Sequence, residues 1–372
     1  MDQANTESYL RKPRVLVAPL NWGLGHATRC IPIIKELVQQ NIEVLVAGEG
    51  AQQALLQNEF PDLGFIPLPG YKIRYAGSGW GLIWQIVSGI PAILRSIRME
   101  NRWLQNAVKE YSLDGVIADN RYGLYHDQIP CIFLTHQLTI KSPFGKSSEK
   151  ILQGWNYRWI NHFAEVWVPD TESSDNLAGD LSHPQKKPGI RVRYINPLTR
   201  FEKKPIAETE GALLVILSGP EPQRRIIEDK IINELKNHHG PVTMVRGLPA
   251  GSSIIPSFGE NIFYNHLPAD ELNCAVQSAE FVISRSGYST IMDLVKLKKK
   301  TILIPTPGQT EQEYLASHLL KNRIAFCISQ KEFSFHDALT SARQFDYRFP
   351  DIQENDHLKN AVREFVLSIQ SH

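Results

Sequence analysis

The stretch Phe281–Tyr314, FVISRSGYSTIMDLVKLKKKTILIPTPGQTEQEY, decides the predicted fold class. Its two apolar runs, Phe281–Ile283 and Thr301–Pro305, predict buried strands, and each run stops at a turn that contains glycine. A helix is predicted after each turn, and the second helix has the Thr-x-x-Glu spacing of a capping box between Thr310 and Glu313. Strands that feed helices in this way predict an open parallel α/β sheet, whose ligands bind at the carboxyl ends of the strands.

The alternation of strand and helix continues over the rest of the chain, which predicts two doubly wound α/β halves. We divide the chain at 196/197 and expect the final helix, within 353–372, to pack near the first half. The strand at 165–169 is expected to be the last of the first half, and 173–188 an irregular connection. The other predicted strands are 14–20, 42–47, 63–68, 114–118 and 130–135 in the first half, and 212–217, 242–245 and 261–264 in the second.

The composition limits the classes of protein. A chain of 372 residues fits two domains, and its formal net charge of +1 gives no sign of bulk nucleic-acid binding. The four cysteines are scattered without metal-ligand spacing, which indicates reduced thiols in a cytoplasmic protein. The polar N-terminus does not resemble a signal peptide, and no apolar run is long enough to span a bilayer.

The first glycine-rich loop, Gly23-Leu24-Gly25-His26, lies between a predicted strand and a helix, where a dinucleotide fingerprint would stand. Thr28 occupies the place of the third glycine and no convincing acidic partner follows, so the loop argues against an NAD-dependent dehydrogenase. The glycines still allow a ligand to approach the backbone closely. His26 is either a site residue above the sheet or a helix cap.

Polar residues also follow two buried strands of the first half. Asp119 and Arg121 come after the strand at 114–118, and His136 comes after the strand at 130–135. Side chains at the carboxyl ends of parallel strands are typical site residues, although ordinary loop polarity is the alternative.

The second half offers two similar corners. Ser218-Gly219 ends one strand and could hold a phosphate on backbone N–H groups, while Ser286-Gly287 and Thr290 begin another helix. Asp293 follows one turn later, where it would accept bonds from a ribose or stabilise the helix dipole. The chain has no D-x-D pair, so a metal-dependent sugar-nucleotide site is not expected.

The stretch Trp80–Arg102 is an apolar helix that becomes basic, with Arg95, Arg98 and Arg102 at one end. An apolar face with tryptophan and a basic rim suits the headgroup region of an anionic bilayer. The alternative is that its isoleucines and leucines pack against the sheet.

These motifs resemble the GT-B glycosyltransferases of family 28, the MurG-like group, over nearly the whole chain. Arg285, Ser286, Gly287 and Thr290 match the R-S-G-x-x-T-x-x-E signature, and Asp293 stands where that family has a ribose-binding Glu. Gln312-Glu313 stands where the family has a Gln-Gln pair that reads the donor sugar. Glu313 departs from the pair, because a carboxylate cannot donate as an amide can.

The resemblance extends to both halves. Gly25-His26, with Arg29, is similar to the first glycine-rich loop in a less characterised G-x-G-H-x-x-R branch. Asn196–Arg200 resembles the N-P-x-R linker with one extra residue, and Ser218-Gly219 stands at the donor-phosphate loop, where Pro220 departs from the pattern.

The resemblance implies a GT-B fold, two Rossmann-like domains facing across a cleft, and a glycosyltransferase that moves a hexose or N-acetylhexosamine from a UDP-linked sugar to a hydroxyl, without a metal or other cofactor. The acceptor is expected to be lipid-linked, with peripheral contact between Trp80–Arg102 and the inner face of an anionic membrane. A nucleotide-sugar 2-epimerase of the same fold and a non-catalytic nucleotide-sugar-binding protein remain alternatives. The expected base is His26. The expected donor-binding residues are Arg200, Ser218, Gly219, Arg285, Ser286, Gly287, Thr290, Asp293, Gln312 and Glu313, and the expected acceptor-binding residues are Gly23, Gly25, Arg29, Asp119, Arg121 and His136.

Overall fold

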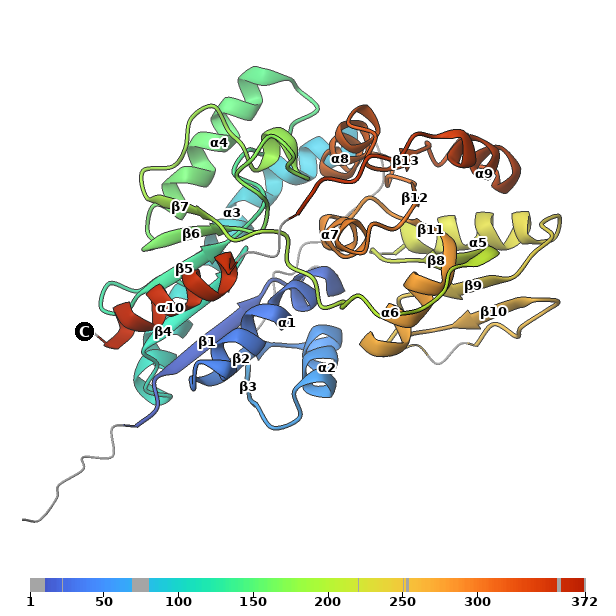
Figure 1. Cartoon of the computed structure of the whole chain (residues 1–372). Helices are drawn as coiled ribbons and strands as arrows, with labels where there is room; N and C mark the ends of the chain where they lie inside the picture. Colours follow the sequence, from blue (N-terminus) through green and yellow to red (C-terminus); the bar gives the residue numbers. More distant parts are fainter. Residues whose placement is uncertain are drawn as a thin grey trace, which may run out of the picture.

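The computed structural model describes the backbone of residues 11–21, 23–68, 80–219, 221–249, 251, 254–352 and 356–370, and their side chains except those of 80–90. It contains two parallel sheets, each flanked by helices (Figure 1). The seven-stranded sheet has the order β3-β2-β1-β4-β5-β6-β7, and the six-stranded sheet has the order β10-β9-β8-β11-β12-β13. In both sheets the strand order reverses beside the first strand, as in a doubly wound fold.

The central strands of the first sheet, such as β1, β4 and β5, are continuous apolar runs buried on both faces, whereas the edge strands β3 and β7 are partly exposed. All its pairings are parallel, and β4 pairs with β1 across the reversal. Its strands are β1 Arg14–Pro19, β2 Glu43–Gly48, β3 Gly64–Pro67, β4 Gly115–Asp119, β5 Cys131–Leu134, β6 Glu165–Val168 and β7 Arg191–Tyr194, and its helices are α1 Leu24–Gln39, α2 Gly50–Glu59, α3 Trp80–Glu110, α4 Lys146–Ile160 and the 3-10 turn η1 Gly179–Leu181.

The second sheet repeats this plan in the second half. Here β11 pairs with β8 across the reversal. Its strands are β8 Thr209–Ile216, β9 Val242–Val245, β10 Asn261–Tyr264, β11 Ala279–Ser284, β12 Thr301–Leu303 and β13 Phe326–Cys327, and its helices are α5 Gln223–Leu235, α6 Ala269–Ser278, α7 Tyr288–Lys296, α8 Thr310–Lys321 and α9 Phe335–Gln344.

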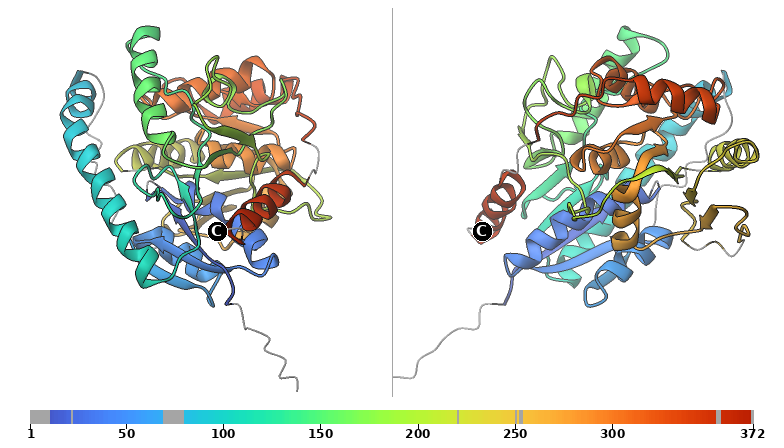
Figure 2. Two further views of the ribbon diagram at one scale, coloured as in Figure 1. Left: turned by 90° about the vertical axis from the view of Figure 1, so that its left-hand side faces the viewer. Right: turned by 45° about the vertical axis from the view of Figure 1, so that its right-hand side comes forward.

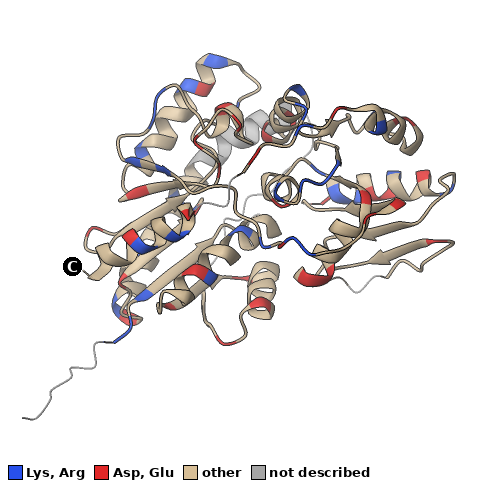
Figure 3. Ribbon diagram, in the orientation of Figure 1, with Lys and Arg blue, Asp and Glu red and all other residues tan. Residues whose placement is uncertain are grey.

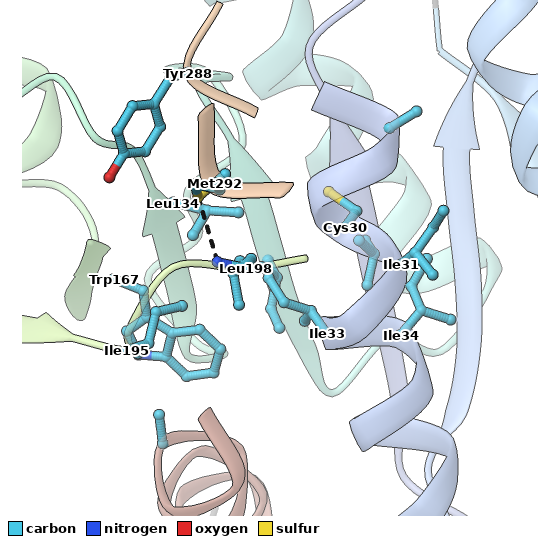
Figure 4. Close-up of a cluster of buried hydrophobic side chains, with 14 of the residues drawn as sticks. Cys30, Ile31, Ile33, Ile34, Leu134, Trp167, Ile195, Leu198, Tyr288 and Met292 are labelled. Atoms are coloured by element: carbon cyan, nitrogen blue, oxygen red, sulfur yellow. Dashed lines mark hydrogen bonds between the residues drawn. The ribbon is translucent and has the colours of Figure 1, made fainter. Parts of the chain in front are cut away.

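A single apolar cluster joins the two halves (Figure 4). Tyr288 and Met292 of α7 pack among side chains of the first half, such as Leu134 and Trp167. The Met292 sulfur accepts a hydrogen bond from the Leu198 amide at 3.3 Å, and the Tyr288 hydroxyl donates to the Pro169 carbonyl at 2.8 Å. The halves are therefore held together by buried contacts as well as by the connecting chain.

The last helix, α10 (His357–Gln370), returns to the first half, whereas α9 covers the second (Figures 1 and 2). Phe365 of α10 packs edge-on against Trp167, with 6.0 Å between ring centroids. A Cβ on Gly115 would lie 2.7 Å from the Phe365 ring, so the helix contacts β4 directly. A second contact of α10 is ionic, because the Glu364 carboxylate pairs with Arg191 and Arg193 of β7.

The structure corrects three sequence expectations. The strand at 165–169 is not the last of the first sheet, because Arg191–Tyr194 pairs beyond it as β7. Helix α4 was not expected. The predicted capping box at the start of α8 is also wrong, because the N-cap is Gln309 and its side chain does not bond to a backbone N–H of the helix. The start of the predicted C-terminal segment, residues 353–355, lies outside the described residues.

Within the described ranges, no helix is long and apolar enough to cross a membrane. Figure 3 shows basic and acidic residues intermixed on both halves in that view, in keeping with a formal net charge of +1.

Candidate active site

The candidate site lies where the strand order reverses in the two sheets. In the first sheet the reversal falls between β1 and β4, and in the second between β8 and β11. Doubly wound sheets bind their ligands in the crevice at such a reversal. The N-terminal turns of α1 and α7, which follow β1 and β11, pack against each other. The two reversals therefore face one another across the contact between the halves.

Gly25 is the point of closest approach between these helices. A Cβ on Gly25 would lie 2.3 Å from the Ser289 hydroxyl oxygen of α7. Gly23, the residue before α1, has φ of 76°, a left-handed conformation that glycine adopts without strain. Gly23 thus serves the turn, and Gly25 serves the contact between the helices.

His26 does not cap α1, because the N-cap is Gly23 and no side chain bonds there. The His26 ring instead lies against Asp119 at the end of β4, with 3.0 Å between Nδ1 and the carboxylate Oδ2. Asp119 is completely buried, whereas the His26 side chain keeps 17% of its exposure. The pair therefore combines a fixed carboxylate with an accessible imidazole.

Arg29 holds the other side of the same carboxylate. Its Nε donates to Asp119 Oδ2 at 3.0 Å, and its Nη2 donates to Oδ1. Burial alone would raise the pKa of Asp119, but the charges of Arg29 and His26 outweigh it and bring this pKa to about 2. Asp119 is therefore an anion at any physiological pH, ready to orient His26 and to stabilise a proton on its ring.

His136 joins this group to the second half. Its Nδ1 lies 3.1 Å from Arg29 Nη1, and its Nε2 lies 2.7 Å from Glu311 Oε1 on the first turn of α8. Its ring is stacked on Tyr288 of α7, with centroids 4.1 Å apart and planes 7° apart. Glu311 and Tyr288 were not singled out from the sequence, although Glu311 stands just after a strand end, as His26 does.

Arg121, expected on the acceptor side, lies inside the scaffold and has no exposed surface. Its guanidinium donates to Glu100 of α3 at 2.8 Å and to the Pro19 carbonyl at 2.8 Å. These bonds fix α3 to the end of β1. Arg121 therefore shapes the site from behind, and direct contact with an acceptor would require it to leave this pair.

The donor corner of β8 is open to solvent. Ser218 and Gly219 are exposed, and Gly219 has φ of 105°. Pro220 lies outside the described residues. The residue before the following helix α5, Pro222, makes no side-chain cap, but the Arg225 amide in the first turn donates to the Glu221 carboxylate at 3.2 Å. Binding of a phosphate at this corner stays a prediction.

The second corner follows β11. Gly287 precedes α7 without a side-chain cap, and Thr290 is half-buried in its first turn. The Ser286 hydroxyl donates to the Gln312 carbonyl at 2.8 Å, which ties this corner to α8.

Arg285 is placed differently from expectation. Its Nη1 donates to the carbonyls of Ile304 and Pro305, each at 3.2 Å, and its Nη2 donates to the Gln223 carbonyl and the Gln330 side chain. Burial lowers its pKa to about 10. These bonds give Arg285 a structural role between β11, β12 and α5, and contact with a diphosphate stays a prediction.

Asp293 and Arg200 lie together where the halves join. Asp293 Oδ1 accepts a hydrogen bond from the Thr199 hydroxyl at 2.6 Å. Burial raises the pKa of Asp293 to about 6, against the opposing charge of Arg200. Arg200 Nε is buried without a hydrogen-bond partner in the described part of the chain. The pair therefore retains both acceptor and donor capacity for a ligand.

Polar side chains at the start of α8 form hydrogen bonds with the loop that precedes the helix. The Gln312 Oε1 accepts from the Thr306 amide at 2.9 Å, and its Nε2 donates to Gln309 Oε1 at 2.7 Å. Glu313 accepts from the Gly308 amide at 2.9 Å. The acidic residue that replaces the expected second Gln therefore fixes a turn, and the carboxylate that points toward the first half is Glu311.

Comparison with known proteins identifies the fold and the class. Residues 260–365 match the glycosyltransferase family 28 C-terminal domain. The UDP-N-acetylglucosamine–N-acetylmuramyl-(pentapeptide) pyrophosphoryl-undecaprenol N-acetylglucosamine transferase of Synechococcus sp. (strain JA-3-3Ab) is 25% identical over 84% of this chain and 79% of its own length. A protein of Methanosarcina acetivorans named as an uncharacterized glycosyltransferase is 22% identical over 81% of each chain.

Solved structures agree on the fold. The glycotransferase of kitacinnamycin superposes with a TM-score of 0.59 over 97% of this chain and 96% of its own, at 14% identity. MurG of Acinetobacter baumannii gives 0.51 over 97% and 95%, at 13% identity. All four proteins are named as transferases or as MurG, and none supports the 2-epimerase alternative. The chain is a glycosyltransferase with the GT-B fold, and its second half resembles family 28.

Proposed function

We propose that this glycosyltransferase moves a sugar from a UDP-linked donor, held by the second half, to a hydroxyl of an acceptor held by the first half, with His26 as general base. One observation carries the proposal: the accessible imidazole of His26 is bonded to the buried carboxylate of Asp119 at the reversal of the first sheet. Asp119 as an anion favours the tautomer with the proton on Nδ1, which leaves Nε2 free to accept a proton.

The bonds of the reaction balance with these groups. The acceptor hydroxyl gives its proton to His26 Nε2, and its oxygen forms a bond to the anomeric carbon of the donor sugar. The bond from that carbon to the diphosphate breaks, and the diphosphate leaves with the electron pair. The imidazolium that forms is stabilised by Asp119.

The leaving diphosphate requires positive electrostatic potential on the donor side. The N-terminal turn of α7, which lacks a side-chain cap, offers backbone N–H groups, and Arg200 adds a cation. Asp293 would accept hydrogen bonds from the ribose. We propose that these groups replace a metal, since the sequence offers no D-x-D pair.

We further propose a lipid-linked acceptor reached at a membrane surface. Helix α3 runs along the outer side of the first half (Figure 2). Its described part forms a groove of about 400 Å³ lined by Pro91, Leu94, Arg95, Arg98, Met99 and Arg102. Apolar side chains with a basic rim suit the headgroup region of an anionic bilayer.

A donor screen tests the proposed function first. Thermal unfolding is measured with UDP-, GDP- and TDP-sugars, and a bound donor raises the midpoint by mass action. We expect the UDP-sugars to give the largest shift, and product analysis then separates transfer from 2-epimerisation, which needs no acceptor. No shift with any UDP-sugar would contradict the donor assignment, and binding without turnover in the presence of acceptor hydroxyls would favour a binding protein.

The membrane proposal has its own test. We expect sedimentation with anionic liposomes at low salt, weaker binding as salt rises, and loss of binding when Trp84 and Arg95 are both replaced. A protein that stays in the supernatant with these liposomes would indicate a soluble acceptor.

A further inference from the structure

A chain of hydrogen bonds connects the two halves to His26. It begins at Glu311 on α8, passes through His136 and Arg29, and ends at Asp119 and His26. Only Glu311 belongs to the half expected to hold the donor. The other four residues belong to the half that carries the base.

The donors and acceptors in this chain fix its protons. Arg29 can only donate, so its Nη1 gives a hydrogen bond to His136 Nδ1, which must be unprotonated. His136 therefore carries its proton on Nε2 and donates to Glu311 at 2.7 Å. Arg29 Nε and Nη2 donate to Asp119. His26 Nδ1 lies 3.0 Å from both Asp119 Oδ2 and Arg29 Nη2, and the proposed base donates from this nitrogen to Asp119. The contacts thus determine the direction of the hydrogen bonds between Arg29 and Glu311, and the direction at His26 follows from its proposed role.

The burial of His136 agrees with this assignment. Burial lowers the pKa of His136, although Glu311 opposes the effect, so the ring is neutral when the halves are in contact. Burial alone would raise the pKa of Glu311, but His136 outweighs it and the pKa is lowered. With Glu311 and Asp119 negative and Arg29 positive, the chain has one net negative charge when both imidazoles are neutral.

We propose that Glu311 and His136 are positioning residues for the transfer reaction. Through Arg29 they hold Asp119, and hence the His26 ring, in the reactive orientation only while the second half is closed against the first. Donor binding to the second half and ordering of the base in the first half are then coupled. The inference rests on the proposed role of His26, and it adds two residues that act on His26 through Arg29 and Asp119.

The alternative is that Glu311 and His136 only stabilise the contact between the halves. Substitutions distinguish this structural role from a role in positioning His26. Glu311→Ala removes the acceptor for His136 Nε2. Glu311→Gln keeps an acceptor oxygen but removes the charge. His136→Phe keeps a ring for stacking on Tyr288 and removes both nitrogens. The exposed Glu271 of α6 offers a control, Glu271→Gln, with the same chemical change away from the site.

We expect Glu311→Ala to lower kcat on the order of 10- to 100-fold, because small displacements of a reacting group cost that much. UDP affinity should change by less than about twofold if the residue acts on the base rather than on the donor. His136→Phe should cause a similar loss, and the double variant should be no worse than either single one, since both break the same chain. Glu271→Gln should match the parent protein.

The charge gives a second readout that needs no activity. The charged groups facing His26 are Arg29 on its own helix, Asp119 of β4 and, through His136, Glu311 of α8. Removing the negative charge of Glu311 disfavours the imidazolium, so Glu311→Gln should lower the pKa of His26 in an NMR titration. The acid limb of the kcat profile should move to lower pH with it.

Two results would overturn the inference. One is a Glu311→Ala enzyme with the parent kcat and pH profile. The other is a Glu311→Gln protein whose His26 titrates as in the parent while only the KM for donor rises, which would make Glu311 a donor contact. If the parent protein shows no transfer at all, the proposed function fails instead, and the NMR titration still decides whether the chain of bonds reaches His26.

Discussion

The two sheets share one strand order but equip their reversal points differently. In the first sheet the reversal holds ionised, buried side chains that bond one another, namely Arg29 and Asp119 beside His26. In the second sheet the reversal has the exposed Ser218-Gly219 and the uncapped first turn of α7, while its buried Arg285 is bonded mainly to carbonyls. We therefore assign proton transfer to the first half and anion binding to the second, as proposed above.

The largest effect on activity should come from removing the proposed general base of the first half. We expect His26→Ala to lower kcat by about 10²–10⁴-fold, the usual contribution of a general base. UDP affinity, measured by calorimetry, should not change, because His26 belongs to the other half. The exposed His239 provides a control, His239→Ala. A rate near that of the parent at saturating acceptor would leave His26 with a structural role only.

Substitutions in the second half should lower the affinity for UDP rather than kcat. Asp293→Ala should weaken UDP binding at least about tenfold, since a hydrogen bond to a charged group contributes roughly 1.5–3 kcal/mol. Unchanged UDP affinity in a folded variant would rule out the ribose contact.

The pKa of Asp293 adds a pH test of the same residue. Because its pKa is raised to about 6, the carboxylate is lost as pH falls through 6, and UDP affinity should fall with it. The stability effect has the opposite sign: the folded state binds this proton more tightly than the unfolded chain, so the contribution to stability is present at low pH and is lost as pH rises through about 6. Asp293→Asn should remove both dependences. Parallel titrations of UDP affinity and unfolding free energy check this.

The contact between the halves can be tested at Gly25. Gly25→Ala should destabilise the protein by about 1–3 kcal/mol, because the new Cβ would lie 2.3 Å from Ser289 Oγ. Gly25 has ordinary helical backbone, where alanine alone would be favourable by up to about 1 kcal/mol. The double variant Gly25→Ala, Ser289→Gly should therefore recover much of the loss in a denaturant titration. A single variant as stable as the parent would show that the helices can separate freely.

The smallest effect is expected at the ion pair that joins α10 to β7. Glu364 is about half exposed, so Glu364→Ala should cost under about 1 kcal/mol despite its two arginine partners. High salt should reduce the difference between the two proteins in chemical denaturation. A cost of several kcal/mol would mean that charge, rather than apolar packing, holds α10 in place.

Much of the fold follows from local patterns. Apolar runs followed by glycine turns identified the buried strands within one to three residues, because burial on both faces requires continuous apolar sequence. β7 was missed because its arginines, paired with Glu165 and Glu364, make it resemble a loop. Helix α4 was missed because its outer face carries exposed Ile151 and Trp155, which blurs the helical pattern.

The sequence predicted where the site residues lie in the fold, but it did not predict their roles. Residues at strand ends were recognisable, which is why His26, Asp119 and His136 were all proposed. Their roles depend on which side chains meet across the fold, and sequence spacing does not contain that information. Asp119 pairs with His26 from 93 residues away, and Glu311 meets His136 from 175 residues away. Arg121 and Arg285 occupy similar strand-end positions, yet both guanidinium groups donate their hydrogen bonds to groups inside the protein, such as the carbonyls of Pro19 and Ile304.

The return of α10 to the first half also governs the order in which the protein can mature. Sheet strands up to Tyr194 emerge from the ribosome long before His357, with roughly 160 residues between them. At 5–20 residues per second this interval lasts about 8–30 s, during which the apolar surface that Phe365 and Ile369 later cover is bare. The first half is thus made first but completed last. A nascent chain stalled before α10 should therefore expose an apolar, aggregation-prone surface on the half that carries the proposed base. A chaperone would have to protect this half.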